Sequence, residues 1–317
     1  MSRLFRDVDG GLSCPQGSVV CIGAFDGLHL GHRALVRRAV ARARDLGVPA
    51  VALTFEPLPR EFFAPADPPP RLTLARAKFE GLRDLGIDVV GLLRFDAKLA
   101  AMPAERFAED VLARRLGARE VWIGPDFRFG HKRAGDLALL QTIGAQTGAF
   151  TAHAIEPVLL DGERVSSTRI RTALAAGDFD GAARLLDRRY AIAGRVVRGK
   201  QLGRTLGYPT ANLRYGGKRP PLQGIFATRV HGVAAAPIDA VASFGTRPTV
   251  AGVEPLLEAH LFDFDGDLYG RRIAVEFVAR LRDELAFADL PALVAQMHRD
   301  AEQARVLLST LPQQACA

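Results

Sequence analysis

The first half of the chain alternates short apolar runs with longer stretches that have the periodicity of a helix. The apolar runs are 18–22, 50–54, 89–93 and 120–123, and the helical patterns cover 30–45, 76–85 and 104–116. This alternation is typical of βαβ units, whose parallel strands are buried on both faces. It predicts a Rossmann-like, doubly wound α/β domain that binds its ligands at the carboxyl ends of the strands.

The pattern changes near Asp187. From there the chain shows short β-rich runs broken by Gly and Pro, without helical periodicity between them: 190–197, 224–230, 238–243, 256–264 and 272–277. These runs predict a compact antiparallel barrel or sandwich, and we favour a Greek-key-type β-barrel. Asp289 and Pro291 suit the first turn of a terminal helix. At about 150 residues per domain, the 317 residues are expected to form two domains, 1–186 and 187–317.

Composition excludes several classes of protein. The 42 Lys and Arg against 35 Asp and Glu give a net charge of +7, without the long runs of like charge that mark a nucleic-acid tail. Three cysteines (Cys14, Cys21 and Cys316) are too few for a disulfide framework and contain no C-x-x-C pair. We expect a cytoplasmic protein that is a monomer or weak homo-oligomer, without a nucleic-acid or membrane partner, because neither a secretion signal nor a long apolar run is present.

The segment Gly23–His32, GAFDGLHLGH, follows the first apolar run and opens the first helical pattern. A helix N-terminus offers free N–H groups and the positive end of a dipole, which suits a triphosphate. His29 and His32 can donate hydrogen bonds to phosphate oxygens as charge develops during a displacement. A tight turn with two helix-capping histidines is the structural alternative. The preceding Phe-Asp-Gly and the position after a strand favour a nucleotide site.

This segment resembles the G-x-F-D-G-x-H-x-G-H signature of nucleotidyltransferases that join an adenylyl group to a phosphate monoester. A second segment, Ser166–Arg171, resembles the I-S-S-T-x-I-R element that closes over ATP phosphates in that family. Arginines are unfavourable at a helix N-terminus unless an anion joins them, which favours a functional role over a solvated first turn. The resemblance implies catalytic roles for His29 and His32. The implied ATP-binding residues are Gly23, Phe25, Asp26, Gly31, Ser167, Thr168, Arg169 and Arg171.

Residues 124–136 resemble the D-F-R-F-G-x-x-R-x-G segment of bacterial FAD synthetases, where it lies at the flavin site. The resemblance implies that Phe62, Asp126 and Phe127 bind the flavin, since aromatic rings can stack on an isoalloxazine. Without it, aromatic residues of this loop would be interpreted as core. The loop 54–59 is similar to an F-x-P-H-P loop of the same family, but Leu58 stands where His is common.

In the second half, Gly-rich residues 194–212 end in Pro-Thr-Ala-Asn. Glycines let backbone N–H groups line a phosphate, and Thr210 and Asn212 offer oxygens of the kind that Mg²⁺ accepts. A Gly-rich turn alone is more often structural. The whole segment, however, is similar to the signature of riboflavin kinases, as are 243–249 and 267–270. The resemblance implies a magnesium site at Thr210 and Asn212. It implies ATP-binding roles for Gly199, Gly203, Arg204, Gly207, Thr210 and Asn212.

A kinase that acts on an alcohol needs a group that accepts the hydroxyl proton. Glu258 is our candidate, because alternation along 256–264 places it on the face of Leu256, His260 and Phe262, where a carboxylate is costly unless it is used. Its place in the sequence also matches the catalytic Glu of riboflavin kinases. An edge-strand surface residue is the alternative, and Glu254, ahead of Pro255, is interpreted as an ordinary loop acid.

Nearly all of the chain thus resembles the bacterial bifunctional riboflavin kinase/FAD synthetases. The resemblance implies two reactions that use ATP and Mg²⁺, riboflavin to FMN and FMN to FAD plus pyrophosphate. One alternative is an enzyme of the same class in which one half is inactive, and Leu58 in place of the common His is the only residue that suggests it. Another is a flavin- or nucleotide-binding regulator without turnover, which has no need of a positioned base.

Overall fold

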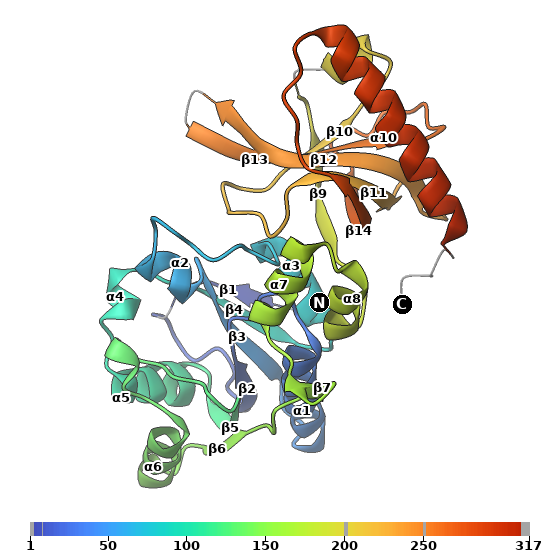
Figure 1. The fold of residues 1–317 in the computed structure, drawn as a ribbon. Helices are drawn as coiled ribbons and strands as arrows, with labels where there is room; N and C mark the ends of the chain where they lie inside the picture. Colours follow the sequence, from blue (N-terminus) through green and yellow to red (C-terminus); the bar gives the residue numbers. More distant parts are fainter. Residues whose placement is uncertain (1–2, 8, 200–201, 250–251, 312–317) are drawn as a thin grey trace. The chain divides into compact units, whose positions relative to one another are not determined.

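The structure is a computed structural model that describes residues 3–7, 9–199, 202–249 and 252–311. The chain divides into two compact units (Figure 1). The first unit consists of residues up to Pro69 and Ala75–Ser166, and the second of Pro70–Leu74 and the residues from Ser167 onward. The boundary between the two contact-based units thus follows Ser166. The predicted domains 1–186 and 187–317 are regions expected to fold independently, and their limits stay a prediction.

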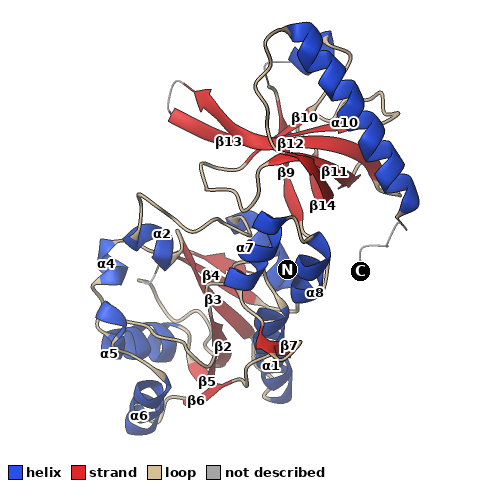
Figure 2. Cartoon of the chain, viewed as in Figure 1, coloured by secondary structure: helices blue, strands red, loops and turns tan. Residues whose placement is uncertain are grey.

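The first unit is a parallel six-stranded sheet with helices on both faces (Figure 2). Its strands are β1 (Arg3–Phe5), β2 (Ser18–Ile22), β3 (Ala50–Glu56), β4 (Val89–Arg94), β5 (Ala118–Ile123) and β6 (Thr151–Ala154). The strand order is β1-β4-β3-β2-β5-β6, so the direction of winding reverses between β2 and β5. The predicted doubly wound fold is confirmed. The edge strands β1 and β6 were not predicted.

Helices of different types connect these strands. They are α1 (Leu30–Asp45), α2 (Pro59–Phe63), α3 (Ala75–Asp84), α4 (Ala97–Ala100), α5 (Ala104–Arg106), the π-helix η1 (Phe107–Arg115), the 3-10 turn η2 (His131–Arg133) and α6 (Leu137–Thr147). A small hairpin of β7 (Leu159–Leu160) and β8 (Glu163–Arg164) follows β6. The pattern at 104–116 indicated one regular helix, and the structure instead continues α5 as the wider η1.

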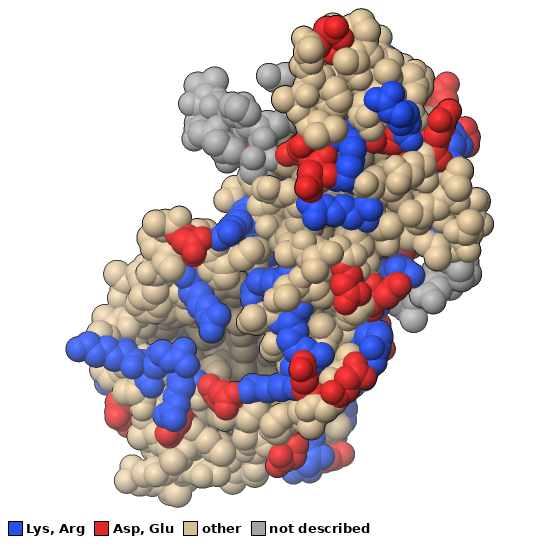
Figure 3. All heavy atoms as spheres, in the orientation of Figure 1, with Lys and Arg blue, Asp and Glu red and all other residues tan. Residues whose placement is uncertain are grey.

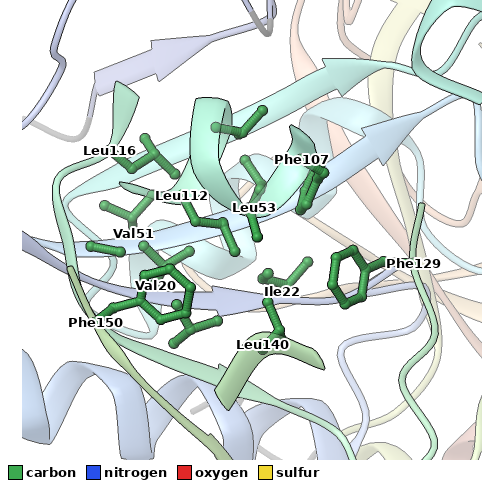
Figure 4. Close-up of a cluster of buried hydrophobic side chains, with 14 of the residues drawn as sticks. Val20, Ile22, Val51, Leu53, Phe107, Leu112, Leu116, Phe129, Leu140 and Phe150 are labelled. Atoms are coloured by element: carbon green, nitrogen blue, oxygen red, sulfur yellow. The ribbon is translucent and has the colours of Figure 1, made fainter. Parts of the chain in front are cut away.

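The sheet of the first unit has an apolar layer on each face. Along β2, Val20 and Ile22 pack with residues of η1 and α6, which Figure 4 shows around Leu112 and Leu140. The alternate residue Cys21 faces the other way and packs with residues of α1 and α3. All five residues of β2 are buried, and four of them are apolar, as expected for a parallel strand that is covered on both faces. This burial also fixes the strand end that carries the Gly23–His32 segment.

The second unit is built around a closed antiparallel barrel (Figure 1). It begins with α7 (Ser167–Ala176) and α8 (Phe179–Leu186). The barrel strands are β9 (Ala191–Val197), β10 (Ala211–Arg214), β11 (Gly224–His231), β12 (Ile238–Thr249), β13 (Gly252–Leu261) and β14 (Arg272–Arg282). The barrel order is β10-β13-β12-β11-β14-β9, so β14 returns to lie beside β11, which is the Greek-key arrangement.

Two short elements of the barrel were not predicted. The four-residue helix α9 (Leu202–Thr205) interrupts a region for which no helix was expected, and the short strand β10 follows it. The run 256–264 was also misplaced, since β13 begins earlier and ends at Leu261. Segments of four residues are too short to show a periodicity of either kind, which is why sequence pattern missed them.

The terminal helix α10 (Leu290–Thr310) packs on the barrel as expected. Asp289 caps it by accepting the backbone N–H of Ala292 at 2.8 Å. Ala304 and Leu308 are fully buried against barrel residues. The buried carboxylate of Asp300 accepts two hydrogen bonds from Arg282, at the end of β14, at 2.8 and 2.6 Å. No helix among the described residues is long and apolar enough to span a membrane.

Candidate active sites

The Gly23–His32 segment forms the turn between β2 and α1, which we call the β2–α1 loop (residues 23–29). His29 is the N-cap of α1, and its Nδ1 accepts the backbone N–H of His32 at 3.2 Å. Because Nδ1 accepts, the ring proton of neutral His29 resides on Nε2, which is then a donor. The rings of His29 and His32 are stacked with centroids 3.7 Å apart, so the structure brings together the two predicted catalytic imidazoles.

His32 is held in its neutral form. Burial lowers its pKa well below the ordinary value, and the neighbouring His29 and Lys78 lower it further. Its Nδ1 is buried and has no hydrogen-bond partner among the residues that the structure describes. An orphaned buried nitrogen is costly, so a partner from a bound ligand would stabilise this arrangement.

The β2–α1 loop is strained. Phe25 and Leu28 adopt left-handed backbone angles of φ +47°, which non-glycine residues rarely do. Both side chains are buried, and so is Asp26. At Gly31 an added Cβ would lie 3.2 Å from Cε1 of His29, so the absence of a side chain lets the helix start approach the imidazole. Backbone strain of this kind is typical of binding loops that the surrounding structure holds in place.

The loops after β2 and β5 emerge at neighbouring strand ends, where the strand order reverses. Ile22 pairs with Ile123, so the β2–α1 loop and the segment that begins at Gly124 start side by side. A topological switch point of this kind is where open α/β sheets bind ligands. Figure 3 shows Lys and Arg side chains gathered around a hollow in the surface of the first unit.

The predicted flavin residues lie at two strand ends. Phe127 is half-buried and stacks on Phe129, with centroids 5.7 Å apart, while Phe129 itself belongs to the core. Asp126 is exposed and forms an ion pair with Arg164. Phe62, on α2 after β3, packs edge-on against Phe95 at 5.4 Å. These contacts leave the flavin roles of Phe62, Asp126 and Phe127 as predictions.

Leu58, which replaces the common His, has a structural place. Its side chain is buried, and its backbone N–H donates to Glu61 at 2.9 Å at the start of α2. The departure from the family pattern is thus accommodated by local packing at the start of α2.

The Ser-Ser-Thr-Arg segment begins α7, which belongs to the second unit. Ser167 and Thr168 form its first turn, as the sequence predicted, and Ser166 is the last residue of the first unit. Arg171 donates to the carbonyl of Pro70 at 2.6 Å. This carbonyl already stabilises the Arg171 guanidinium near the helix N-terminus. The argument that an arginine there needs a bound anion is therefore weaker. The ATP-binding roles of Ser167, Thr168, Arg169 and Arg171 stay predictions.

Lys78 was not among the predicted site residues. The side chain of this α3 residue is fully buried, and its Nζ donates to the carbonyl of Ala24, in the β2–α1 loop, at 2.8 Å. A signal was available, because Lys78 lies one helical turn before the buried Leu82 and so on the apolar face of its helix. A lysine there is almost never fully buried without a specific partner.

In the second unit, the Gly-rich segment folds back over β10. A Cβ on Gly199 would lie 2.9 Å from the side chain of Asn212, and a Cβ on Gly203 would lie 2.3 Å from the carbonyl of Tyr208. Both glycines are required by these close approaches. Gly207 has φ +84°, and Arg204 is exposed. Lys200 and Gln201, which belong to the same segment, lie outside the described residues.

Asn212 and Glu258 face each other across β10 and β13, and Ser243 of β12 pairs with Glu258 on its other side. Asn212 is only 5% exposed, and its Nδ2 donates to the carbonyl of Thr210 at 3.1 Å. Its Oδ1 is buried without a hydrogen-bond partner among the described residues. The Cβ atoms of cross-strand pairs lie about 5 Å apart, so the structure brings Asn212, one of the two predicted metal ligands, close to the predicted base.

The surroundings of Glu258 differ from the prediction. The buried face of β13 carries Leu257, Ala259 and Leu261. Glu258 is half-buried on the opposite face with Leu256 and His260, and Phe262 lies beyond the strand. The argument that an apolar face makes this carboxylate costly is therefore wrong, and the cross-strand pairing is the better one. Glu254 also lies in β13 rather than in a loop.

A cavity of about 350 Å³ is lined by His260, which lies on the same face of β13 as Glu258. It is lined by Leu206, Gly207, Tyr208, His260, Phe262, His298, Ala301, Glu302 and Arg305. The hydroxyl of Tyr208 is hydrogen-bonded to Nδ1 of His298, and burial raises the pKa of that hydroxyl, so it keeps its proton. Nδ1 of His260 lies 2.9 Å from the carbonyl oxygen of Pro209. The rings of Tyr208, His260, Phe262 and His298 thus line a space beside the Pro-Thr-Ala-Asn segment.

Comparisons with known proteins cover both units. Residues 12–169 match the family model described as FAD synthetase, and residues 186–308 match the model described as riboflavin kinase. The chain is 46% identical to a Pseudomonas fluorescens protein named bifunctional riboflavin kinase/FMN adenylyltransferase, over 92% of this chain and 93% of that one. It is 42% identical to a protein of the same name from Escherichia coli K12, over 96% and 97%.

A solved structure confirms the architecture of the chain. It is titled a macrolide-efflux protein from Streptococcus pneumoniae and is 30% identical to this chain, with a TM-score of 0.75. The alignment covers 96% of this chain and 98% of that one. The parallel sheet, the antiparallel barrel and the terminal helix therefore occur together in a related protein.

Proposed function

The chain belongs to the bifunctional riboflavin kinase/FMN adenylyltransferase family, and we propose that each of its units carries one of the two reactions. The enzyme phosphorylates riboflavin with ATP to FMN, and it transfers the adenylyl group of a second ATP to FMN, which gives FAD and pyrophosphate. The observation that supports the division is that each unit brings one pair of predicted site residues together, His29 with His32 and Asn212 with Glu258.

Product analysis tests this function. Purified protein with riboflavin, ATP and Mg²⁺ is expected to form FMN first and FAD later, and FMN with ATP is expected to give FAD without a lag. Chromatography of the flavins over time distinguishes these outcomes. Binding of riboflavin or ATP without any product would instead favour the regulator.

In the kinase reaction, Glu258 accepts the proton of the ribityl 5′-hydroxyl as its oxygen attacks the γ-phosphorus of ATP. The new bond joins the 5′-oxygen to phosphorus, and the bond from phosphorus to the bridging oxygen of ADP breaks. Positioning and charge neutralisation supply most of the rate in such transfers. The strands β10 and β13 supply the positioning, because they hold Asn212 directly opposite Glu258.

The donor set of the barrel fits Mg²⁺. The orphaned Oδ1 of Asn212 and the hydroxyl of Thr210 are hard oxygen ligands of the kind this ion accepts, and the ion usually completes its shell with water and substrate phosphates. No group of three or more His, Cys, Asp or Glu side chains that could hold a metal occurs among the described residues. Bound there, Mg²⁺ would neutralise charge on the ATP phosphates, while Asn212 would orient them toward Glu258.

Replacement of Asn212 by Ala is therefore expected to raise the Mg²⁺ concentration needed for half-maximal FMN formation by about tenfold or more, because one buried charge-assisted contact is lost. FAD formation from FMN is the internal control and is expected to keep the Mg²⁺ dependence of the wild type. Titration of both reactions with MgCl₂ measures the effect. An unchanged requirement for FMN formation would remove Asn212 from the metal site.

The cavity beside His260 is our candidate for the adenine ring of the ATP used by the kinase. It adjoins the Gly-rich segment that would hold the phosphates, and Tyr208 and Phe262 line it. The guanidinium of Arg305 lies over the ring of Phe262, 4.2 Å from its centroid, and a planar base would stack there in its place. Phe262→Ala is expected to raise the KM for ATP in FMN formation about tenfold with little change in kcat, because stacking on a base acts equally in the ground and transition states. A change in kcat alone would contradict this assignment.

In the adenylyl transfer, the phosphate of FMN is the nucleophile, and an oxygen of it attacks the α-phosphorus of ATP while pyrophosphate leaves. The nucleophile is already anionic, so no strong base is required. The Nε2–H of His29 and the ring of His32 are placed to donate to oxygens that gain charge. The phosphates would lie at the N-terminus of α1, at the positive end of the helix dipole.

A further inference from the structure

Lys78 is a buried charged residue close to the His29–His32 pair that has no role in the reactions described so far. Its side chain is fully buried on the inner face of α3, and Thr54, on β3, is equally buried beside it. The Nζ of Lys78 lies 3.4 Å from Oγ1 of Thr54. Burial of an ammonium group is costly unless specific acceptors hold it, so this residue type at this position calls for an explanation.

Lys78 and Thr54 both donate to one peptide group of the β2–α1 loop. The Nζ of Lys78 donates to the carbonyl of Ala24 at 2.8 Å, and Oγ1 of Thr54 donates to the same carbonyl at 3.1 Å. Ala24 precedes Phe25, one of the two strained residues. The carbonyl of an otherwise exposed residue is thus fixed from beneath by two donors from two different elements.

We propose that Lys78 is a positioning residue for adenylyl transfer, which holds the β2–α1 loop in its strained conformation through the carbonyl of Ala24. The loop ends at His29, whose Nδ1 caps α1 and whose Nε2–H would face the phosphates. A loop that is anchored at Ala24 keeps this donor in place without any rearrangement when ATP binds. The inference rests on the proposed function of the first unit.

The charge of Lys78 also favours the neutral form of His32. It is one of the causes that hold the pKa of His32 low, together with burial and His29. Lys78 therefore stabilises the neutral form of the ring that stacks on His29. A neutral amide or thioether in its place would weaken both the anchor and this electrostatic contribution.

The experiment replaces Lys78 by Met, which keeps the length of the side chain and removes its charge. We expect kcat/KM for FAD formation from FMN to fall about 10- to 100-fold, in line with the loss of a buried charged hydrogen bond, mostly in kcat. FMN formation from riboflavin by the same molecules should stay within about twofold of wild type. If Lys78→Met only destabilised the fold, fewer molecules would be active and both reactions would slow.

Two further variants sharpen the result. Thr54→Val removes only the second donor to Ala24 and should give a smaller loss of FAD formation than Lys78→Met. Arg76→Met removes an exposed charge of the same helix, which is paired with Glu80, and should leave both rates unchanged.

The outcomes separate this inference from the proposed function. No FAD from the wild-type protein would contradict the function itself. A wild type that makes FAD, with Lys78→Met equal to it in kcat and KM, would contradict the role of Lys78 alone. Equal losses of both reactions in Lys78→Met would assign the residue to general stability and would likewise overturn the proposal.

Discussion

Glu258→Gln is expected to abolish nearly all FMN formation from riboflavin, with a fall in kcat of about 10²- to 10⁴-fold, the usual contribution of a general base. The amide keeps the size of the side chain but cannot accept the hydroxyl proton. Its position opposite Asn212 is fixed by the β10–β13 pairing, so the substitution leaves the barrel intact. Steady-state assays with riboflavin, and separately with FMN, measure the two reactions.

Glu254→Gln is the matched control for this experiment. Glu254 lies on the same strand and is half-buried like Glu258, but it pairs with Arg247 rather than with Ser243. Its substitution should leave FMN formation within about twofold of the wild type, as for most substitutions away from a reacting group. Equal losses in both variants would show that the charge of this strand, and not a base at Glu258, supports the reaction.

The reverse separation is expected for the two imidazoles of the first unit. The double variant His29→Asn with His32→Ala should lower FAD formation from FMN by at least about 100-fold, since removal of a single transition-state donor commonly costs 10²- to 10³-fold. Asn is a good helix N-cap, so it replaces the acceptor that His29 provides to α1 and removes only the ring donor. FMN formation should be unchanged.

His153→Ala provides a control on the same sheet. Its ring stacks on Trp122 with centroids 4.7 Å apart, and it lies on β6. Loss of this ring is expected to affect stability modestly and neither rate. If it lowered FAD formation as much as the double variant, the effect of His29 and His32 would be attributed to the fold of the unit.

Much of the architecture follows from local pattern. The helix predicted at 30–45 coincides with α1, and the apolar run 18–22 with β2, because strong periodicity and two-sided burial agree there. The short segments α9 and β10 could not be predicted in the same way. Each has four residues, too few to show a periodicity, and β10 is defined by its pairing with β9 and β13, which are distant in sequence.

The candidate sites show the same division. Motif spacing identified His29, His32, Asn212 and Glu258, and the fold brings them together in pairs. The hydrogen bond that fixes the tautomer of His29 and the orphaned Oδ1 of Asn212 depend on side-chain geometry, which spacing does not contain. The anchor at Lys78 was missed because α3 lies far from the β2–α1 loop in sequence and meets it only in the folded unit.

We infer that the two reactions use separate catalytic groups, the His29–His32 pair and the Asn212–Glu258 pair, and a mixing experiment tests this separation most directly. The Glu258→Gln variant and the His29→Asn/His32→Ala variant are each expected to make no more than traces of FAD from riboflavin. Combined in one solution with riboflavin, ATP and Mg²⁺, they should make FAD, because the FMN released by one variant is a substrate for the other. Free FMN that accumulates to completion without FAD, or no FMN at all, would contradict the claim.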